Sequence, residues 1–264
     1  MISKLLFIPR AAADIIKVLL HKNIPFSERW NIAKALAEIK IASLTKKLNE
    51  PFCFHLGKWK ISCLYNGHIG FLVKEIFVEE VYALNKNKEV FKILDLGSNI
   101  GLSVAYFKMR FPDAAIEAYE PDKNSFELLQ KNIGENDWKN ISANQTAVSD
   151  ENGFLFASSI EEKASVNSNF ATAGKEESQV PAEGISEILQ EKFDVIKMDV
   201  EGGEWRIFKK IIEHQLISKA NNWFVEFHQI EKNKKQFEEI LNCFAKNGFE
   251  KEERKEVIYF YKNI

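Results

Sequence analysis

The residues best placed to do chemistry lie in three separate stretches of this 264-residue chain. Residues 93–101 read ILDLGSNIG, Glu120 follows a second apolar run, and residues 199–204 read DVEGGE. An apolar strand that enters a glycine-containing turn and then a helix, with an acid at the end of the next strand, is typical of a nucleotide-type cofactor site. The sequence therefore predicts such a site at the carboxyl edge of a parallel sheet.

The spacing of the glycines indicates which cofactor this is. A dinucleotide fingerprint reads GxGxxG and holds a pyrophosphate at a helix N-terminus. Here Gly101 falls four residues after Gly97, in the pattern DxGxNxG. This spacing favours a bulky ligand without phosphates, S-adenosylmethionine, over NAD. Glu120, 19 residues after Gly101, is positioned to accept hydrogen bonds from both ribose hydroxyls.

The elements that must position these residues alternate regularly after residue 90. Apolar runs at 92–96, 114–119, 141–148, 193–198 and 223–227 predict strands, and helical spacing through 100–107, 126–133, 205–212 and 237–244 predicts the helices between them. Residues 249–254 and 257–261 form a predicted antiparallel hairpin. The predicted fold is α/β with a mostly parallel sheet. Residues 149–192 interrupt the alternation, with short strands predicted at 154–157 and 167–172.

The first 50 residues are predicted to be a helical extension, and residues 51–264 the cofactor-binding domain. Two helices are indicated, the second with Ser27 as its N-cap. Residues 52–65 predict one or two strands around Gly57, and residues 71–84 a helix. The favoured role for the extension is packing on the catalytic domain. The alternatives are a substrate lid, a dimerisation arm and a membrane-surface helix.

The chain resembles the FkbM-type methyltransferases, which depend on S-adenosylmethionine and have the class I Rossmann-like fold. The resemblance covers about residues 71–228. It is carried by EIF at 75–77, residues 93–101, YEPD at 119–122, AVSD at 147–150 and, most specifically, IKMDVEG at 196–202. Gly203 departs from the alanine that is usual in the family. The resemblance implies O-methylation of a hydroxyl on a sugar, glycan or secondary metabolite.

The site residues follow from strand-end geometry together with this resemblance. Residues around the methionine part of the cofactor would be Asp95, Gly97, Ser98, Asn99 and Gly101. Glu120 and Pro121 would lie at the ribose, and Asp199 would contact the cofactor or the acceptor. By the resemblance alone, Ala147 would lie near the adenine and Glu75 would belong to the site.

Methylation of a hydroxyl benefits from a general base, because a hydroxyl is a poor nucleophile until it begins to lose its proton. His228 is the preferred base, since a neutral imidazole is available near pH 7. Asp199 and Glu201 are the other predicted catalytic residues. Each has a structural alternative: His228 as a histidine satisfied at a strand end, and Glu201 as a cap of the following helix.

A metal site is not predicted, because no dedicated metal motif has the required spacing. Asp199, Glu226 and His228 remain an alternative, because their ligand atoms suit Mg²⁺ and other O-methyltransferases use a comparable arrangement.

Composition excludes several other classes. With 45% apolar and 28% charged residues and a net charge of −2, the chain shows no basic excess that would mark a nucleic-acid partner. Its three cysteines lack disulfide or zinc spacing and predict a cytoplasmic protein. No membrane-spanning segment is predicted. An NAD-dependent oxidoreductase and a non-catalytic cofactor-binding module remain alternative functions, and the sequence leaves the oligomeric state open.

Overall fold

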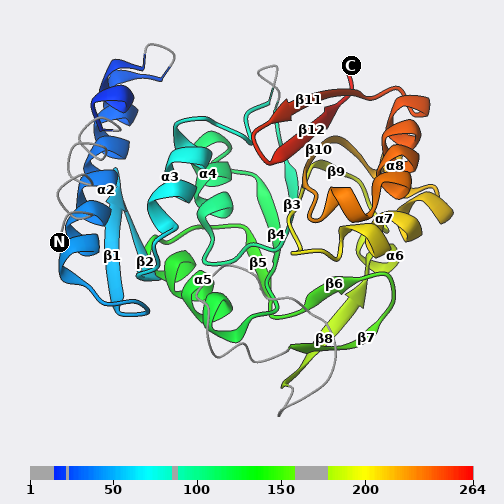
Figure 1. The fold of residues 1–264 in the computed structure, drawn as a ribbon, viewed down its shortest axis with the longest axis horizontal. Helices are drawn as coiled ribbons and strands as arrows, with labels where there is room; N and C mark the ends of the chain where they lie inside the picture. The colour runs from blue at the N-terminus through cyan, green and yellow to red at the C-terminus, as the bar shows by residue number, and fades with distance from the viewer. Residues whose placement is uncertain (1–14, 22–23, 85–88, 158–177, 264) are drawn as a thin grey trace. The chain divides into compact units, whose positions relative to one another are not determined.

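A computed structural model describes residues 15–21, 24–84, 89–157 and 178–263 of the chain. These residues form two compact units. Unit 1 contains the described residues up to Val81 together with residues 131–137, and unit 2 contains the other described residues (Figure 1). The division between the units falls about thirty residues after the predicted domain boundary at residue 50.

Unit 1 combines helices with a two-stranded hairpin. Residues 15–20 are helical, and α2 (Phe26–Thr45) packs on β1 (Pro51–Leu56) and α3 (Ile69–Phe77). Strand β1 pairs antiparallel with β2 (Trp59–Leu64), which confirms the two strands predicted around Gly57. The predicted cap of α2 is wrong: the helix begins at Phe26, after Pro25, and Ser27 makes no capping hydrogen bond. The helix predicted at 71–84 begins earlier and ends at Phe77.

Unit 2 is built on a seven-stranded sheet in the order β11-β12-β10-β9-β3-β4-β5. Its strands are β3 (Lys92–Leu96), β4 (Ala115–Tyr119), β5 (Ile141–Asn144), β9 (Phe193–Met198), β10 (Ala220–Glu226), β11 (Glu250–Arg254) and β12 (Val257–Tyr261). The five neighbouring strands β10, β9, β3, β4 and β5 are parallel. Strands β12 and β11 complete the sheet as an antiparallel hairpin. The predicted α/β class, the mostly parallel sheet and the terminal hairpin are confirmed.

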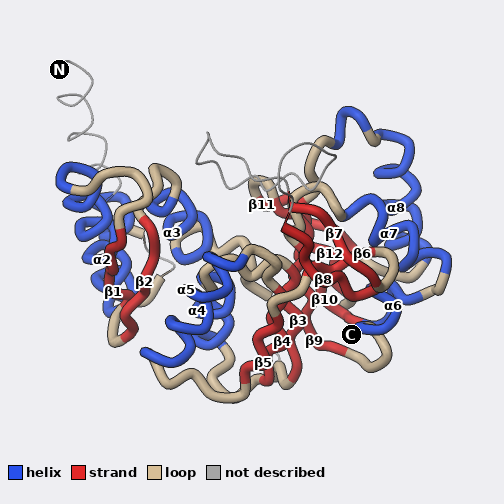
Figure 2. Tube along the Cα trace, turned by 90° about the horizontal axis from the view of Figure 1, so that it is seen from below, coloured by secondary structure: helices blue, strands red, loops and turns tan. Residues whose placement is uncertain are grey.

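Helices cover both faces of this sheet (Figure 2). On one side lie α6 (Ile185–Ile188), α7 (Glu204–Glu213) and α8 (Lys234–Lys246), with two 3₁₀ turns at Leu216–Lys219 and Ile230–Lys232. On the other lie α4 (Leu102–Arg110) and α5 (Lys123–Glu135). The face toward α7 and α8 is an apolar core that contains Leu94, Ile196 and Trp223. Because side chains alternate along a strand, Asp95 and Lys197 project to the opposite face.

A second, smaller sheet replaces part of what was predicted as one strand. Residues 141–148 divide into β5, in the large sheet, and β6 (Ala147–Ser149), which pairs parallel with β8 (Ser178–Gly184). Strand β7 (Gly153–Ala157) pairs antiparallel with β8. The single strand predicted at 141–148 is therefore wrong, because the chain changes sheets at Gln145 and Thr146. The strand predicted at 154–157 is confirmed, and the one at 167–172 lies outside the described residues.

Within the described ranges, the helices are all too short or too polar to cross a membrane.

The end of β3 is held close to the end of β9 at a single glycine. Gly97 has a φ of +81°, and a Cβ built there would lie 1.8 Å from the carbonyl oxygen of Asp199. Gly97 N–H and Ser98 N–H both donate to the carbonyl of Tyr119 at 2.9 Å. The turn thus joins the ends of three neighbouring strands and requires a residue without a side chain.

We expect Gly97→Ala to lower the free energy of unfolding by at least about 3 kcal/mol, because a left-handed alanine is strained and its Cβ meets backbone that cannot move aside. Urea titration followed by circular dichroism measures the change. Gly134→Ala is the matched control, because a Cβ there meets nothing within 4 Å. Inside α5 that exchange should stabilise by about 0.5–1 kcal/mol. Equal stabilities for the two variants would contradict the assigned contact.

Candidate functional site

A cavity of about 270 Å³ opens beyond the carboxyl ends of β3, β4 and β9. This volume is close to the lower end of the roughly 300–1,000 Å³ that small-molecule sites span. Its lining combines glycine backbone, carboxylates and aliphatic side chains. The lining residues are Gly97, Tyr119, Glu120, Pro121, Thr146, Ala147, Val148, Ser149, Leu155, Asp199, Val200, Glu201, Gly202, Gly203, Arg206 and Gln229. The position is where ligands bind in open parallel sheets.

Glu120 is a buried carboxylate that backbone groups hold in place. Its Oε2 accepts a hydrogen bond from Asn99 N–H at 2.7 Å, and its Oε1 accepts one from Asp122 N–H at 2.8 Å. The residue is only 7% exposed, and burial raises its pKa to about 7 despite these two hydrogen bonds. Each oxygen keeps further lone pairs, so the carboxylate can accept two more hydrogen bonds from a ligand that enters the cavity.

Four predicted cofactor residues lie behind the lining instead of in it. Asp95 is fully buried, and its Oδ2 accepts a hydrogen bond from the Ser103 hydroxyl at 2.6 Å. The Ser98 hydroxyl donates to the carbonyl of Asp95 at 3.0 Å. Asn99 has a φ of 49° and uses its side chain to accept from Ile100 N–H. These contacts shape the turn, and direct contact of the four residues with a cofactor stays a prediction.

Gly101, the fourth of these residues, serves helix packing. It has a φ of +89° at the start of α4, and a Cβ there would approach Leu129 Cδ1 to 2.7 Å. The close approach that requires this glycine is therefore to α5.

Lys197 places a positive charge beneath the cavity. The residue is only 3% exposed, and its ammonium donates to the carbonyl of Gly97 at 2.6 Å. It lies 3.5 Å from Asp95 Oδ1 and 3.7 Å from Asp199 Oδ2. Burial alone would lower the pKa of Lys197, but these two carboxylates outweigh it and raise the pKa, so the group stays charged. Lys197 is a site residue that the sequence reasoning missed.

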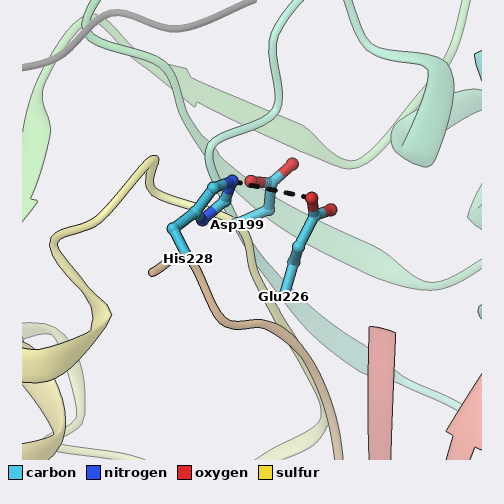
Figure 3. Close-up of side chains that lie close together, drawn as sticks. All are labelled: Asp199, Glu226 and His228. Atoms are coloured by element: carbon cyan, nitrogen blue, oxygen red, sulfur yellow. Dashed lines mark ion pairs between the residues drawn. The ribbon is translucent and has the colours of Figure 1, made fainter. Parts of the chain in front are cut away.

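Beside the cavity, carboxylates surround His228 (Figure 3). Strand β10 ends at Glu226, and Trp205 of α7 donates its indole N–H to the His228 carbonyl at 2.9 Å, which fixes the backbone there. The ring contacts Glu204 Oε1 through Nδ1 at 3.0 Å. Its Nε2 lies 3.3 Å from Glu201 Oε2 and 3.5 Å from Glu226 Oε1.

This environment changes the charge expected on His228. Burial lowers the pKa of the ring, but the hydrogen bond with Glu204 and the surrounding carboxylates raise it to about 9. Burial raises the pKa of Glu201 to about 7 and that of Glu226 to about 8, and the charge of Asp199 acts in the same direction on both. A neutral imidazole near pH 7 was the reason for preferring His228 as the base. In this structure the ring carries a proton at that pH.

The structure brings most of the predicted site residues together. Gly97, Glu120, Pro121, Ala147, Asp199 and Glu201 line the cavity. Ala147 does so from the start of β6 and not from the end of the third strand. Asp199 also joins the cluster around His228. Glu75 is buried in α3 of unit 1, and its place in the site stays a prediction.

Other lining residues were not found from the sequence. Arg206, in the first turn of α7, pairs its Nη2 with Asp150 Oδ1 at 2.7 Å. Asp150 is the last residue of the AVSD motif at 147–150. An acidic partner for Arg206 was therefore visible in the sequence. Leu155 comes from β7 and Val148 from β6, and only the pairing of the small sheet brings both to the cavity.

Comparison with known proteins decides the family. The Methyltransferase FkbM domain matches residues 95–251, more than half of the chain. The chain belongs to the FkbM methyltransferase family. S-adenosylmethionine is therefore its cofactor, and the NAD-dependent alternative is set aside.

Two fungal proteins and one solved structure are similar to this FkbM-family chain. Methyltransferase sdnD of Sordaria araneosa is 25% identical over 178 residues, covering 54% of this chain and 69% of that protein. Methyltransferase 1 of Beauveria bassiana is 27% identical over 165 residues, covering 53% and 66%. The crystal structure of methyltransferase FkbM from Methylobacillus flagellatus KT aligns with a TM-score of 0.50 at 15% identity, over 96% of this chain. Our chain spans 59% of that structure, and the likeness supports the class I Rossmann-like fold.

The residues of the cavity fit S-adenosylmethionine. Glu120 would offer both oxygens to the ribose hydroxyls, and the aliphatic side chains of Val148 and Leu155 would lie against the adenine. Gly97 leaves backbone exposed at the strand end for the methionine part. When bound, this cofactor supplies a methyl group on a positively charged sulfur. A cavity with carboxylates and few cations on its lining suits such a charge.

We expect the binding of S-adenosylhomocysteine to depend on pH through Glu120. Below its pKa of about 7 the side chain is protonated, and above it the carboxylate would accept hydrogen bonds from the ribose hydroxyls. If only the carboxylate binds, affinity should rise about tenfold between pH 6 and pH 8. Glu120→Ala should weaken binding by roughly 1–3 kcal/mol.

Calorimetry at both pH values measures these effects, with Glu117→Ala on β4 as the control. A pH response that persists unchanged in a folded Glu120→Ala variant would remove Glu120 from the ribose site.

Proposed function

We propose that this protein is an O-methyltransferase that transfers the methyl group of S-adenosylmethionine to a hydroxyl of a sugar, glycan or secondary metabolite. The observation that carries the proposal is the position of Asp199, which lines the cofactor cavity and also belongs to the cluster around His228. A cofactor site and a group of proton-accepting side chains thus meet at one residue. A hydroxyl acceptor requires both.

The chain's own residues support this reaction in three ways. The cavity holds the cofactor in one orientation, which supplies much of the rate in a transfer that depends on alignment. The carboxylates of Asp199 and Glu201 and the ring of His228 offer hydrogen-bond partners to an acceptor hydroxyl. The carboxylates can also take up the proton that the hydroxyl loses, whereas the ring, which already carries a proton near pH 7, can do so only after releasing it. Glu204, with no exposed surface, keeps the ring in place through Nδ1.

The proposal includes a cytoplasmic location and an acceptor other than nucleic acid. Two features of the sequence support this: the net charge of −2 shows no basic excess, and the three cysteines lack the spacing of a disulfide framework. The alternative function, a cofactor-binding module without catalysis, predicts binding of S-adenosylhomocysteine without turnover. The deciding experiment incubates the protein with S-adenosylmethionine carrying a labelled methyl group and a panel of glycans and cell extracts, followed by mass spectrometry.

Once an acceptor is found, His228→Ala should lower kcat by about 10²–10⁴-fold while the affinity for S-adenosylhomocysteine changes little, because the ring faces the acceptor side of Asp199. His214→Ala is the matched control, since His214 is an exposed residue at the end of α7. Single-turnover kinetics keep the measurement on the chemical step. Nearly full activity in His228→Ala would transfer the catalytic role to Asp199 or Glu201. Label on a nitrogen or carbon atom would overturn the O-directed assignment.

A further inference from the structure

We propose that Asp199, Glu226 and His228 bind a divalent metal ion beside the cofactor cavity. The three side chains come from the turn after β9, the end of β10 and the residues just beyond it, and they converge in Figure 3. Nothing in the family match assigns a metal to these positions. The inference deepens the proposed function, because the ion would lie where that function places the acceptor hydroxyl.

The ligand atoms have the separations that an ion requires. One atom from each residue lies within 4.8 Å of the others, and His228 Nε2 is 3.5 Å from Glu226 Oε1. An ion with ligands at 2.3–2.6 Å holds neighbouring ligands about 3.3–3.7 Å apart and opposite ligands about 4.6–5.2 Å apart. The cluster thus fits an ion of calcium's size as it stands. The smaller Mg²⁺ would draw the side chains together by about half an ångström.

The two carboxylate oxygens of Asp199 differ in their contacts. Its Oδ2 faces the ammonium of Lys197 at 3.7 Å. Its Oδ1 is buried and accepts no hydrogen bond from any residue that the structure describes. A buried carboxylate oxygen without a donor is costly, and a cation at the cluster would satisfy it.

His228 is oriented as metal-binding histidines are. Such a histidine usually donates its second ring N–H to a carboxylate, which fixes the ring and directs the other nitrogen at the metal. Glu204 fills this place: its Oε1 contacts Nδ1 at 3.0 Å and also accepts from Val200 N–H and Gly202 N–H at 3.2 Å each. The Glu204 side chain is fully buried, and its Oε2 has no partner among the described residues. Nε2 is thereby directed toward Glu226 and Glu201.

The cluster holds more carboxyl groups than the proposed ion needs. Asp199, Glu201, Glu204 and Glu226 lie around the ring of His228, which carries a proton near pH 7, and a bound ion would take the place of that proton on Nε2. Two carboxylates and one imidazole form a mixed oxygen and nitrogen set that suits Mn²⁺ among the common hard ions. Each of the three ligand residues keeps some exposed surface, so coordination positions remain open to an acceptor.

The ion's role in the proposed reaction is to hold the acceptor. A hydroxyl oxygen bound in an open coordination position would lie next to Asp199, at the edge of the cofactor cavity, and would be aligned for transfer. In this state His228 acts as a ligand and not as the general base.

The test measures Mn²⁺ binding directly. The full chain is stripped with a chelator, saturated with S-adenosylhomocysteine and titrated with Mn²⁺, while electron paramagnetic resonance reports the free ion. We expect one Mn²⁺ per chain in the wild type, and affinity at least about tenfold weaker in Glu226→Gln and His228→Ala. The matched control is Glu231→Gln, which makes the same change at an exposed residue that pairs with Lys234. Competition with Ca²⁺ and Mg²⁺ then ranks the ions.

Two results would overturn the site: no saturable Mn²⁺ binding up to millimolar concentrations, or equal affinity in Glu226→Gln and Glu231→Gln. Calorimetry of S-adenosylhomocysteine on the same samples separates this failure from that of the proposed function. Intact cofactor binding without Mn²⁺ binding rejects the metal alone, whereas loss of both rejects the methyltransferase site as well. Because the readout is ion binding, it does not depend on finding the acceptor.

Discussion

The buried ammonium of Lys197 is the interaction on which the site depends. It lies on β9 directly beside Asp95 of β3, and it also holds the carbonyl of Gly97 and a carboxylate oxygen of Asp199. One charge thus fixes the ends of two neighbouring strands and the turn that borders the cavity. Removing one partner of such a buried set typically costs about 3–5 kcal/mol, because the other charge is left without compensation. The positions of Gly97 and Asp199 therefore follow from the same contact.

Most strands of the large sheet were predictable because they are short apolar runs between turn residues. The parallel strands and β12 carry that signal in their own residues, whereas β11, with the sequence EKEER, is charged throughout and follows from its place beside β12. The division between β5 and β6 has no such signal in the sequence. Both segments favour extended backbone, and they differ only in the strands with which they pair. Strand β6 pairs with β8, which begins about thirty residues later, and such long-range pairing leaves no local pattern.

The candidate site shows the same distinction between local and distant causes. Glu120 was predictable from its distance to the glycine turn, and its carboxylate lies in the cavity. The charge of the His228 ring was not predictable, because it depends on carboxylates from α7, the turn after β9 and the end of β10. Lys197 was overlooked as a polar residue in an apolar run, since its partner Asp95 is 102 residues away in the chain. Gly101 was assigned to the ligand because packing against Leu129 cannot be read from spacing.

Because Asp199 borders both the cavity and the cluster around His228, binding at one of these places is coupled to binding at the other. This carboxylate borders the cavity on one side and faces Glu226 and His228 on the other. A charge gained or lost in the cavity changes the electrostatic free energy of Asp199, and this changes how strongly Asp199 attracts a ligand near Glu226 and His228. The reverse also holds. Linkage requires the resulting change in affinity to be equal in both directions. Asp199 would therefore hold a ligand on its far side with a different affinity beside the positively charged methyl donor than beside the neutral product.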